Sequence, residues 1–345
     1  MRENRDKTVD ILRGFGIVLM IMGHIKIGAQ PYDQYFSIWY HGFHMPLFYV
    51  VSGYFFVRSN VDEGDFIFRK ARTLLVPYLF WGIFHIIYSF LEGGGEAGVL
   101  YSNIINLLVN PTVAGVPIAG ALWFLPALFW INVIYFFMSK FIRNNRMLFL
   151  ASLVVGVCGM VAGRRGVHLP MAIDVALVGV AFFATGSLLR EMGDGRIKEH
   201  IFHMKWYVFM VLLIVVNCLL FYNGEVNFRS GVYENFLITY ANAVISTILL
   251  WNVARVMMTK FTKGLPCMFK ESMISIGQNS IIYLCLNQWM VKCIRPVYTS
   301  VGGDLFVWQC VVARGLTLVT VCFICHVVMR VMERSCRLRK YVGKG

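Results

Sequence analysis

The sequence has 345 residues, of which 58% are hydrophobic and only 14% charged, and its mean hydropathy is +0.65. Because soluble domains average about 25% charged residues, this composition excludes an ordinary soluble protein and indicates a polytopic membrane protein. The formal net charge of +14 would suit a nucleic-acid-binding protein, but the positions of the basic residues explain it by membrane topology, as shown below.

Ten apolar stretches are long enough to cross the roughly 30 Å hydrocarbon layer of a bilayer. They lie at residues 9–26, 38–57, 74–91, 119–139, 147–163, 171–189, 206–222, 236–258, 275–294 and 305–331. No soluble domain fits between any two of them, so we predict one all-α, membrane-embedded domain over residues 1–345. The longest connection, Glu92 to Ile118, has room for a short re-entrant or interfacial segment.

The distribution of Lys and Arg predicts the orientation of this domain. Of the 32 basic residues, 24 fall in one set of alternate connections together with both termini, and 6 fall in the other set. Arg13 and Arg314 lie inside predicted spans. By the positive-inside rule, we expect both termini of this multi-pass protein to be cytoplasmic.

Three ionisable residues are embedded in the first predicted span, VDILRGFGIVLMIMGHIK, which ends at Lys26. Asp10, Arg13 and His24 fall on one helical stripe, and Arg13 and His24 are separated by roughly 16 Å along the axis. Charged groups inside a span are costly and mark function by default. The alternative is that Asp10 and Arg13 merely pair with each other near the headgroup boundary.

The second predicted span begins with two more histidines, in the sequence HGFHMPLF. His41 and His44 should share one helix face, at the depth of His24 on the first span. Three histidines at one level could bind zinc, but the usual His-x3-His spacing and a carboxylate partner are absent, so we expect no metal. Hydrogen-bonded interfacial histidines are the plainer interpretation of His41.

The first 85 residues resemble the acyltransferase 3 family, whose members O-acylate sugars and glycans. The resemblance rests on the acidic residue before Arg13-Gly14, on Gly23-His24, on FHMPLF followed by SGYF, and on Arg69-x2-Arg72 before Pro77-Tyr78. It implies an O-acyltransferase with acetyl-CoA as donor and no permanently bound cofactor. The implied acceptor is a hydroxyl group of an envelope glycan or lipid-linked sugar, with no role for nucleic acid.

The resemblance also implies roles for these residues. His24 and His44 would be catalytic, together with Arg13 and Asp10. Arg69 and Arg72 would bind the phosphates of coenzyme A at the cytoplasmic mouth, where Arg can form bidentate contacts; the alternative is that they are only topology signals. His24 would take the proton of the acceptor hydroxyl while an extended pantetheine arm passes Arg13, and His44 would orient His24 or bind the oxyanion.

Later parts of the sequence resemble the family more loosely. Trp123 lies in an LWFL block that could equally be part of an interfacial aromatic belt. Asp174 needs a cationic or hydrogen-bonding partner, and Arg314 could pair with Asp174 or meet a polar substrate. Asn279 and Ser280 match a family segment, but Asn287 stands where many members carry His, so only a hydrogen-bonding role is carried over to it.

A transporter or flippase of a glycan precursor would use the same buried polar stripe as a substrate or proton path. Hydropathy does not separate this class of protein from an acyltransferase. Consumption of labelled acetyl-CoA by membranes that carry the protein would separate the two classes.

Overall fold

The computed structural model of the chain describes residues 6–27, 32–58, 61–192, 196–299, 307–335 and 338–343. This part of the chain is helical and contains a single extended pairing, an isolated bridge between Asn227 and Val232. The predicted all-α fold class is therefore confirmed. The α-helices are α1 (Lys7–His24), α2 (Tyr32–His41), α3 (His44–Tyr54), α4 (Glu63–Lys70), α5 (Val76–Glu92), α6 (Ala97–Leu108), α7 (Phe124–Phe141), α8 (Asn145–Arg164), α9 (Ile173–Glu191), α10 (Arg196–Phe202), α11 (Trp206–Asn223), α12 (Phe236–Lys260), α13 (Gly264–Gln278), α14 (Ser280–Thr299) and α15 (Val307–Arg334). Shorter turns are η1 (Ala71–Leu75, a π-helix), η2 (Gly120–Trp123), η3 (Pro170–Ala172) and η4 (Arg339–Val342).

Seven helical segments of the described chain are long and apolar enough to cross a membrane. They are Glu63–Glu92, Gly120–Phe141, Asn145–Arg164, Pro170–Glu191, Trp206–Asn223, Phe236–Lys260 and Trp308–Arg334. They coincide with seven of the ten predicted spans, which makes the chain a multi-pass membrane protein. The total of ten spans and the cytoplasmic placement of both termini stay predictions.

The other three predicted spans differ from these seven in composition or continuity. Helix α1 is continuous but carries Lys7, Asp10 and Arg13. The span predicted at 38–57 is divided into α2 and α3 at Gly42 and Phe43, and the span predicted at 275–294 is divided at Asn279. These two breaks place polar side chains at helix ends rather than along one helix face.

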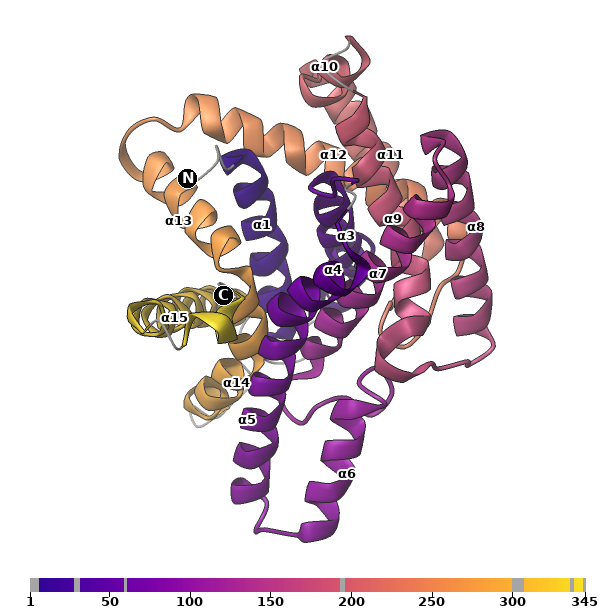
Figure 1. Cartoon of the computed structure of the whole chain (residues 1–345). Helices are drawn as coiled ribbons and strands as arrows, with labels where there is room; N and C mark the ends of the chain where they lie inside the picture. Colours follow the sequence, from indigo (N-terminus) through magenta and orange to yellow (C-terminus); the bar gives the residue numbers. More distant parts are fainter. Residues whose placement is uncertain are drawn as a thin grey trace.

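Helix α1 lies between α13 and α3 and contacts both (Figure 1). Two glycines allow α1 and α13 to approach closely. A Cβ atom on Gly14 would lie 2.3 Å from the Met273 carbonyl oxygen, and one on Gly277 would lie 1.8 Å from the Asp10 carbonyl oxygen. Small residues at such crossings let membrane helices pack backbone against backbone.

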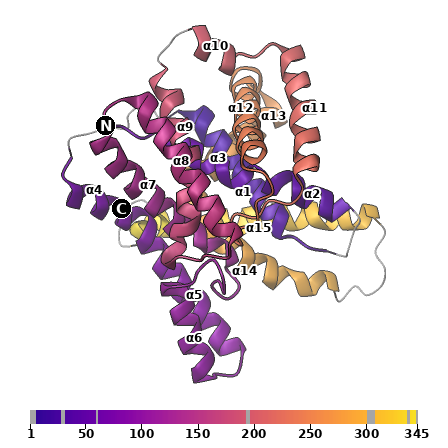
Figure 2. The same cartoon turned by 90° about the vertical axis from the view of Figure 1, so that its right-hand side faces the viewer.

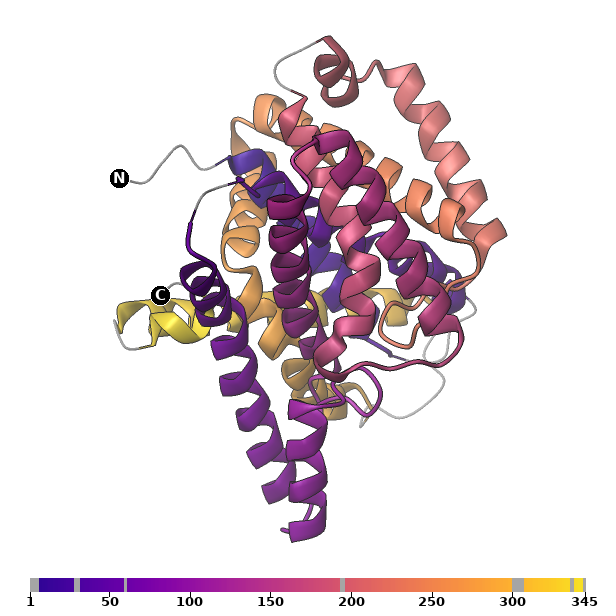
Figure 3. The same ribbon diagram turned by 45° about the vertical axis from the view of Figure 1, so that its right-hand side comes forward.

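A second crossing of this kind joins α3 to α9. A Cβ atom on Gly53 would lie 1.9 Å from the Phe183 carbonyl oxygen, and one on Gly186 would lie 1.8 Å from the Val50 carbonyl oxygen. Helix α9 also packs against α7 and α8, and α8 lies on the side of the molecule opposite α13 (Figures 1 and 3). The buried side chains of α3 and α9 thereby form a continuous core with those of α1.

Helices α5 and α6 form a hairpin that projects from the rest of the molecule (Figures 1 and 3). The Tyr78 hydroxyl donates to the Leu107 carbonyl oxygen and holds the two helices together. Helix α6 occupies the connection that was expected to hold a short re-entrant or interfacial segment. The C-terminal turn η4 packs beside the first turns of α5, where Trp81 Nε1 donates to the Tyr341 carbonyl oxygen at 3.0 Å.

Candidate active site

A cavity of about 920 Å³ lies at the C-terminal end of α1. Residues from α1, α2, α3, η2, the loop before α12, α14 and α15 line it. Five of the predicted site residues meet there: His24, His41, His44, Trp123 and Arg314. The polar residues Lys26, Asp33, Tyr40, Arg229, Gln288 and Arg295 also line the cavity and were not among the predicted site residues.

His24 is the last residue of α1 and is held by an amide from α14. Gln288 Oε1 accepts a hydrogen bond from the Ala121 backbone N–H at 2.9 Å, so the Gln288 NH₂ group is the end that faces His24. Gln288 Nε2 lies 3.1 Å from His24 Nδ1 and 3.3 Å from Nε2. Because an amide NH₂ can only donate, one ring nitrogen of His24 is an acceptor in this arrangement.

His44 is the first residue of α3 and has a fixed tautomer. Its Nδ1 lies 2.8 Å from the Tyr40 carbonyl oxygen, which can only accept, so Nδ1 carries the proton and the neutral ring keeps a lone pair on Nε2. The ring is buried, and its centroid lies 5.5 Å from that of His41. His41 ends α2, with Nδ1 3.0 Å from the Ser37 hydroxyl. The two histidines meet across the break at Gly42 and Phe43, not along one continuous helix as predicted.

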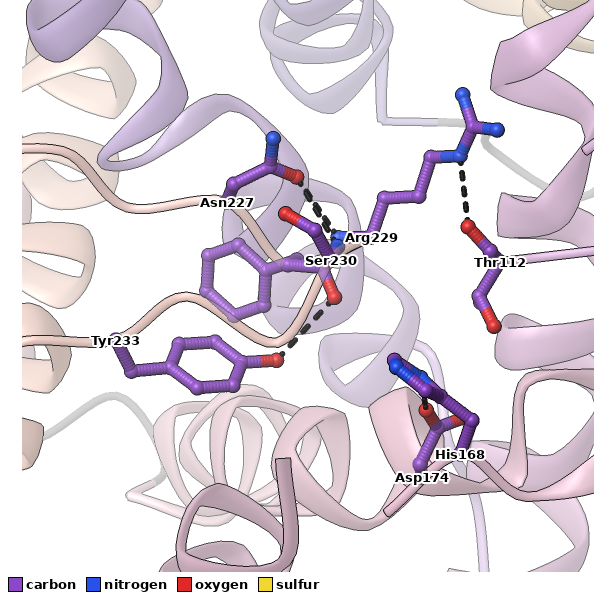
Figure 4. Close-up of polar contacts among 8 residues, drawn as sticks. Thr112, His168, Asp174, Asn227, Arg229, Ser230 and Tyr233 are labelled. Atoms are coloured by element: carbon purple, nitrogen blue, oxygen red, sulfur yellow. Dashed lines mark hydrogen bonds and ion pairs between the residues drawn. The ribbon is translucent and has the colours of Figure 1, made fainter. Parts of the chain in front are cut away.

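Arg229 enters the cavity from the loop between α11 and α12 (Figure 4). Its Nε donates to the Thr112 carbonyl oxygen at 3.0 Å, and its backbone N–H donates to the Asn227 side chain at 3.1 Å. A Cβ atom on Gly120 would lie 2.8 Å from Arg229 Nη1, so this glycine makes room for the Arg229 side chain. Burial lowers the pKa of the Arg229 guanidinium, which nevertheless stays charged at neutral pH.

The sequence left the partners of Asp174 and Arg314 open, and the structure supplies a partner for each. Asp174 is buried beside His168, whose Nδ1 lies 3.4 Å from Asp174 Oδ2 (Figure 4). Arg314 instead pairs with Asp33, with Nη2 2.9 Å from Asp33 Oδ2, and donates to the Ile27 carbonyl oxygen at 3.1 Å. The two deep charges therefore do not meet, because each has a nearer partner, and Arg314 lines the cavity.

The N-terminal half of the polar stripe lies away from this cavity. Asp10 is buried and accepts a hydrogen bond from Gln278 Nε2 at 3.0 Å, while Arg13 lies 4.0 Å from Asp10 and 5.2 Å above the Phe55 ring. The i,i+3 pairing considered from the sequence is thus present, together with a partner from α13.

Arg69 and Arg72 lie at the same end of the molecule as Arg13. Both are exposed, Arg69 on α4 and Arg72 in the π-helical turn that leads into α5. Lys70 lies between them, close enough to Arg69 and Arg13 for their charges to act on it. These four residues form one basic region, which we call the basic mouth.

The predicted residues of the α13–α14 region have local roles. Asn279 donates to the Ser275 carbonyl oxygen at 2.7 Å where α13 ends, and Ser280 begins α14. Asn287 is fully buried and donates to the carbonyl oxygens of Tyr283 and Leu284 at 2.9 and 2.8 Å. Its neighbour Gln288, and not Asn287, faces the cavity.

His24, His41 and His44 all line the cavity, but they are not arranged as a metal site. Among the residues that the structure describes, no group of three or more His, Cys, Asp or Glu side chains could hold a metal ion. The cavity therefore offers histidine nitrogens, an amide and several cations for its chemistry.

Comparison with known proteins gives one match along most of the chain and two shorter ones. The Acyl_transf_3 family, described as an acyltransferase domain, matches residues 6–328. Nodulation protein NolL of Mesorhizobium japonicum is 37% identical over 90 residues, which are 23% of this chain and 23% of that protein. Nodulation protein NolL of Sinorhizobium fredii is 34% identical over 92 residues, 23% of this chain and 24% of that protein. The matches thus span about a quarter of these curated relatives, and no solved structure matches.

Proposed function

Because this chain belongs to the acyltransferase 3 family and is a multi-pass membrane acyltransferase, we propose that it moves an acetyl group from acetyl-CoA to a hydroxyl group of a cell-envelope glycan or lipid-linked sugar. The reaction takes place at the inner membrane of a bacterium. The observation that carries this proposal is the cavity in which His24 and His44 lie beside Gln288 and Arg229.

His24 is the general base. It takes the proton from the acceptor hydroxyl as the hydroxyl oxygen attacks the thioester carbonyl carbon, and it gives that proton to the sulfur of coenzyme A as the carbon–sulfur bond breaks. An imidazole suits this exchange because a ring nitrogen that accepts a hydrogen bond can take a proton and later give it up. The acceptor hydroxyl replaces the Gln288 amide as the hydrogen-bond donor to the accepting ring nitrogen of His24.

Two further groups of the cavity suit the transition state. Arg229 is a fixed positive charge next to Gln288, and it stabilises the negative charge that develops on the thioester oxygen. His44 accepts a hydrogen bond at Nε2 and so orients the acceptor hydroxyl or His24. In its neutral form this ring has no N–H left for the oxyanion, because Nδ1–H is bonded to Tyr40.

The acyl donor enters at the basic mouth. Arg69, Arg72 and Arg13 bind the phosphates of coenzyme A, with Lys70 contributing charge. The pantetheine arm then extends beside α1 toward His24, over the roughly 16 Å that separates Arg13 from His24 along the helix.

Consumption of radiolabelled acetyl-CoA by the purified protein tests the donor, and analysis of envelope glycans in a deletion strain tests the acceptor. We expect the protein to release coenzyme A and the deletion strain to lose glycan acetyl groups. Transport of a labelled glycan precursor without acetyl-CoA consumption would instead establish the transporter alternative.

A further inference from the structure

A second pocket, of about 560 Å³, adjoins the cavity. Met22, Ile25, Phe36 and Arg314 line both spaces, so the two lie side by side. The second pocket is otherwise lined by apolar side chains of α2, α11 and α15, among them Trp39, Phe221 and Leu318. We call it the apolar groove.

The apolar groove opens on the outside of the helix bundle. Figure 2 shows α2 lying between α11 and α15. Of the side chains that line the groove, Tyr35 is 61% exposed, Phe221 46% and Val311 54%. Exposed apolar side chains on a membrane protein face hydrocarbon, so a hydrocarbon chain can enter the groove from the bilayer.

Several cations line the cavity that adjoins the groove. Lys26, Arg229, Arg295 and Arg314 are among its described lining residues, and Asp33 is the carboxylate among them. Asp33 pairs with Arg314, which lines both spaces, so cations outnumber carboxylates in this described lining. Excess positive charge in a partly desolvated site favours an anionic ligand.

We propose that the acceptor is an amphipathic anion, a sugar joined through phosphate to a long hydrocarbon chain. The sugar lies in the cavity beside His24 and His44, the phosphate lies beside Lys26, Arg295 and Arg314, and the chain lies in the apolar groove. This inference rests on the proposed function and selects the lipid-linked sugar over a free envelope glycan. The affinity of the protein for this acceptor then increases with each methylene group that the groove buries.

Photolabelling of the full-length protein in phosphatidylcholine nanodiscs tests this inference without acetyl-CoA. The probe is hexadecyl phosphate with a diazirine in its chain, and its uncharged partner is the alcohol of the same chain. We expect the phosphate probe to label peptides of α2, α11 and α15 that flank the groove. Leu318→Trp fills the groove and should reduce labelling by about fivefold.

Leu316→Trp is the matched control, because Leu316 is 57% exposed on the same helix and does not line the groove. The phosphate probe should label this variant as strongly as it labels the unmodified protein. The combined change Lys26→Gln and Arg295→Gln keeps the Asp33–Arg314 pair and should reduce the preference for the phosphate probe over the alcohol by about tenfold.

Equal labelling of Leu318→Trp and Leu316→Trp would overturn the groove assignment, and equal labelling by phosphate and alcohol would overturn the anionic acceptor. The proposed function is checked separately by acetyl-CoA consumption. The protein could also transfer acetyl groups to a water-soluble glycan while the phosphate probe neither labels nor inhibits it. That result would remove this inference and leave the proposed function standing. Labelling by the phosphate probe without acetyl transfer would leave the groove assignment standing and would remove the proposed function.

Discussion

His24 and His44 line one cavity, and each is held with a ring nitrogen that accepts a hydrogen bond. The Tyr40 carbonyl oxygen commits the proton of His44 to Nδ1 and leaves Nε2 as an acceptor, and the Gln288 amide requires an acceptor nitrogen on His24. Both rings therefore present an acceptor before substrate arrives, which suits one base for the acceptor hydroxyl and one group that orients it.

Changing His24 to Ala should lower acetyl transfer by about 10²–10⁴-fold, since general-base catalysis contributes that much, while leaving acetyl-CoA binding nearly unchanged. Binding of acetyl-CoA and acetyl transfer should be measured on the same purified variant. His203→Ala, an exposed histidine that does not line the cavity, is the control and should behave as the unmodified protein. A His24→Ala protein that transfers at a near-normal rate would leave His44 as the base.

The residues of the cavity show what the sequence could and could not predict. His24, His41 and His44 were predictable because ionisable residues within apolar stretches are conspicuous. Gln288 and Arg229 were not predictable, since a glutamine beside Asn287 and an arginine in a loop carry no signal until the chain folds. Asn287 was predicted because it stands where many family members carry His. Adjacent residues of a helix point in directions about 100° apart, and in this chain the direction of Gln288 is the one that faces the cavity.

At the scale of elements, arginines on α4 and η1 form the basic mouth with Arg13 of α1. Replacing Arg69 and Arg72 together with Ala should raise KM for acetyl-CoA by about tenfold and change kcat less, because a contact to phosphate is made in both the ground state and the transition state. Steady-state kinetics with acetyl-CoA as the varied substrate measures this. Arg146→Ala removes an exposed basic residue at the start of α8 and should change neither constant. Equal KM values in both variants would make Arg69 and Arg72 topology signals only.

The close crossing of α3 and α9 makes a stability prediction. A Cβ atom on Gly186 would lie 1.8 Å from the Val50 carbonyl oxygen, so Gly186→Ala forces the two helices apart and should cost about 1–3 kcal/mol or more. Gly98→Ala on α6 is the control, because no atom lies within 4 Å of its added Cβ, and helix propensity alone should stabilise that variant slightly. Thermal unfolding of the purified proteins measures both, and a Gly186→Ala midpoint equal to that of the unmodified protein would contradict the close packing.

Hydropathy predicted most long helices because each long apolar stretch forms one helix of matching length. It did not predict the breaks at Gly42–Phe43 and at Asn279, since both lie inside apolar stretches. Gly42, and Pro46 in the first turn of α3, are nevertheless residues that interrupt helices. The breaks matter more for the site than the spans do. They bring His41 to His44 and begin α14, which carries Gln288.

For the whole molecule, the asymmetry of basic residues predicts which end of α1 faces the cytoplasm. A reporter fused after Gly345 should be cytoplasmic, and one inserted near Gly94, at the tip of the α5–α6 hairpin, should be external. Paired cytoplasmic and periplasmic reporters at each site provide the measurement. An external C-terminus would reverse the orientation and with it the side from which acetyl-CoA enters.

The bond between Asp10 and Gln278 joins residues 268 positions apart, and this has a consequence for biosynthesis. At a synthesis rate of about 5–20 residues per second, α1 waits roughly 10–50 s for its partner after it leaves the ribosome. During that interval the Asp10 carboxylate lacks the amide donor that α13 supplies, and burial of such a group in lipid is costly. Nascent chains that end before α13 should therefore be preferred targets of membrane quality-control proteases, and α1 should become resistant to them only when about four fifths of the chain has been made.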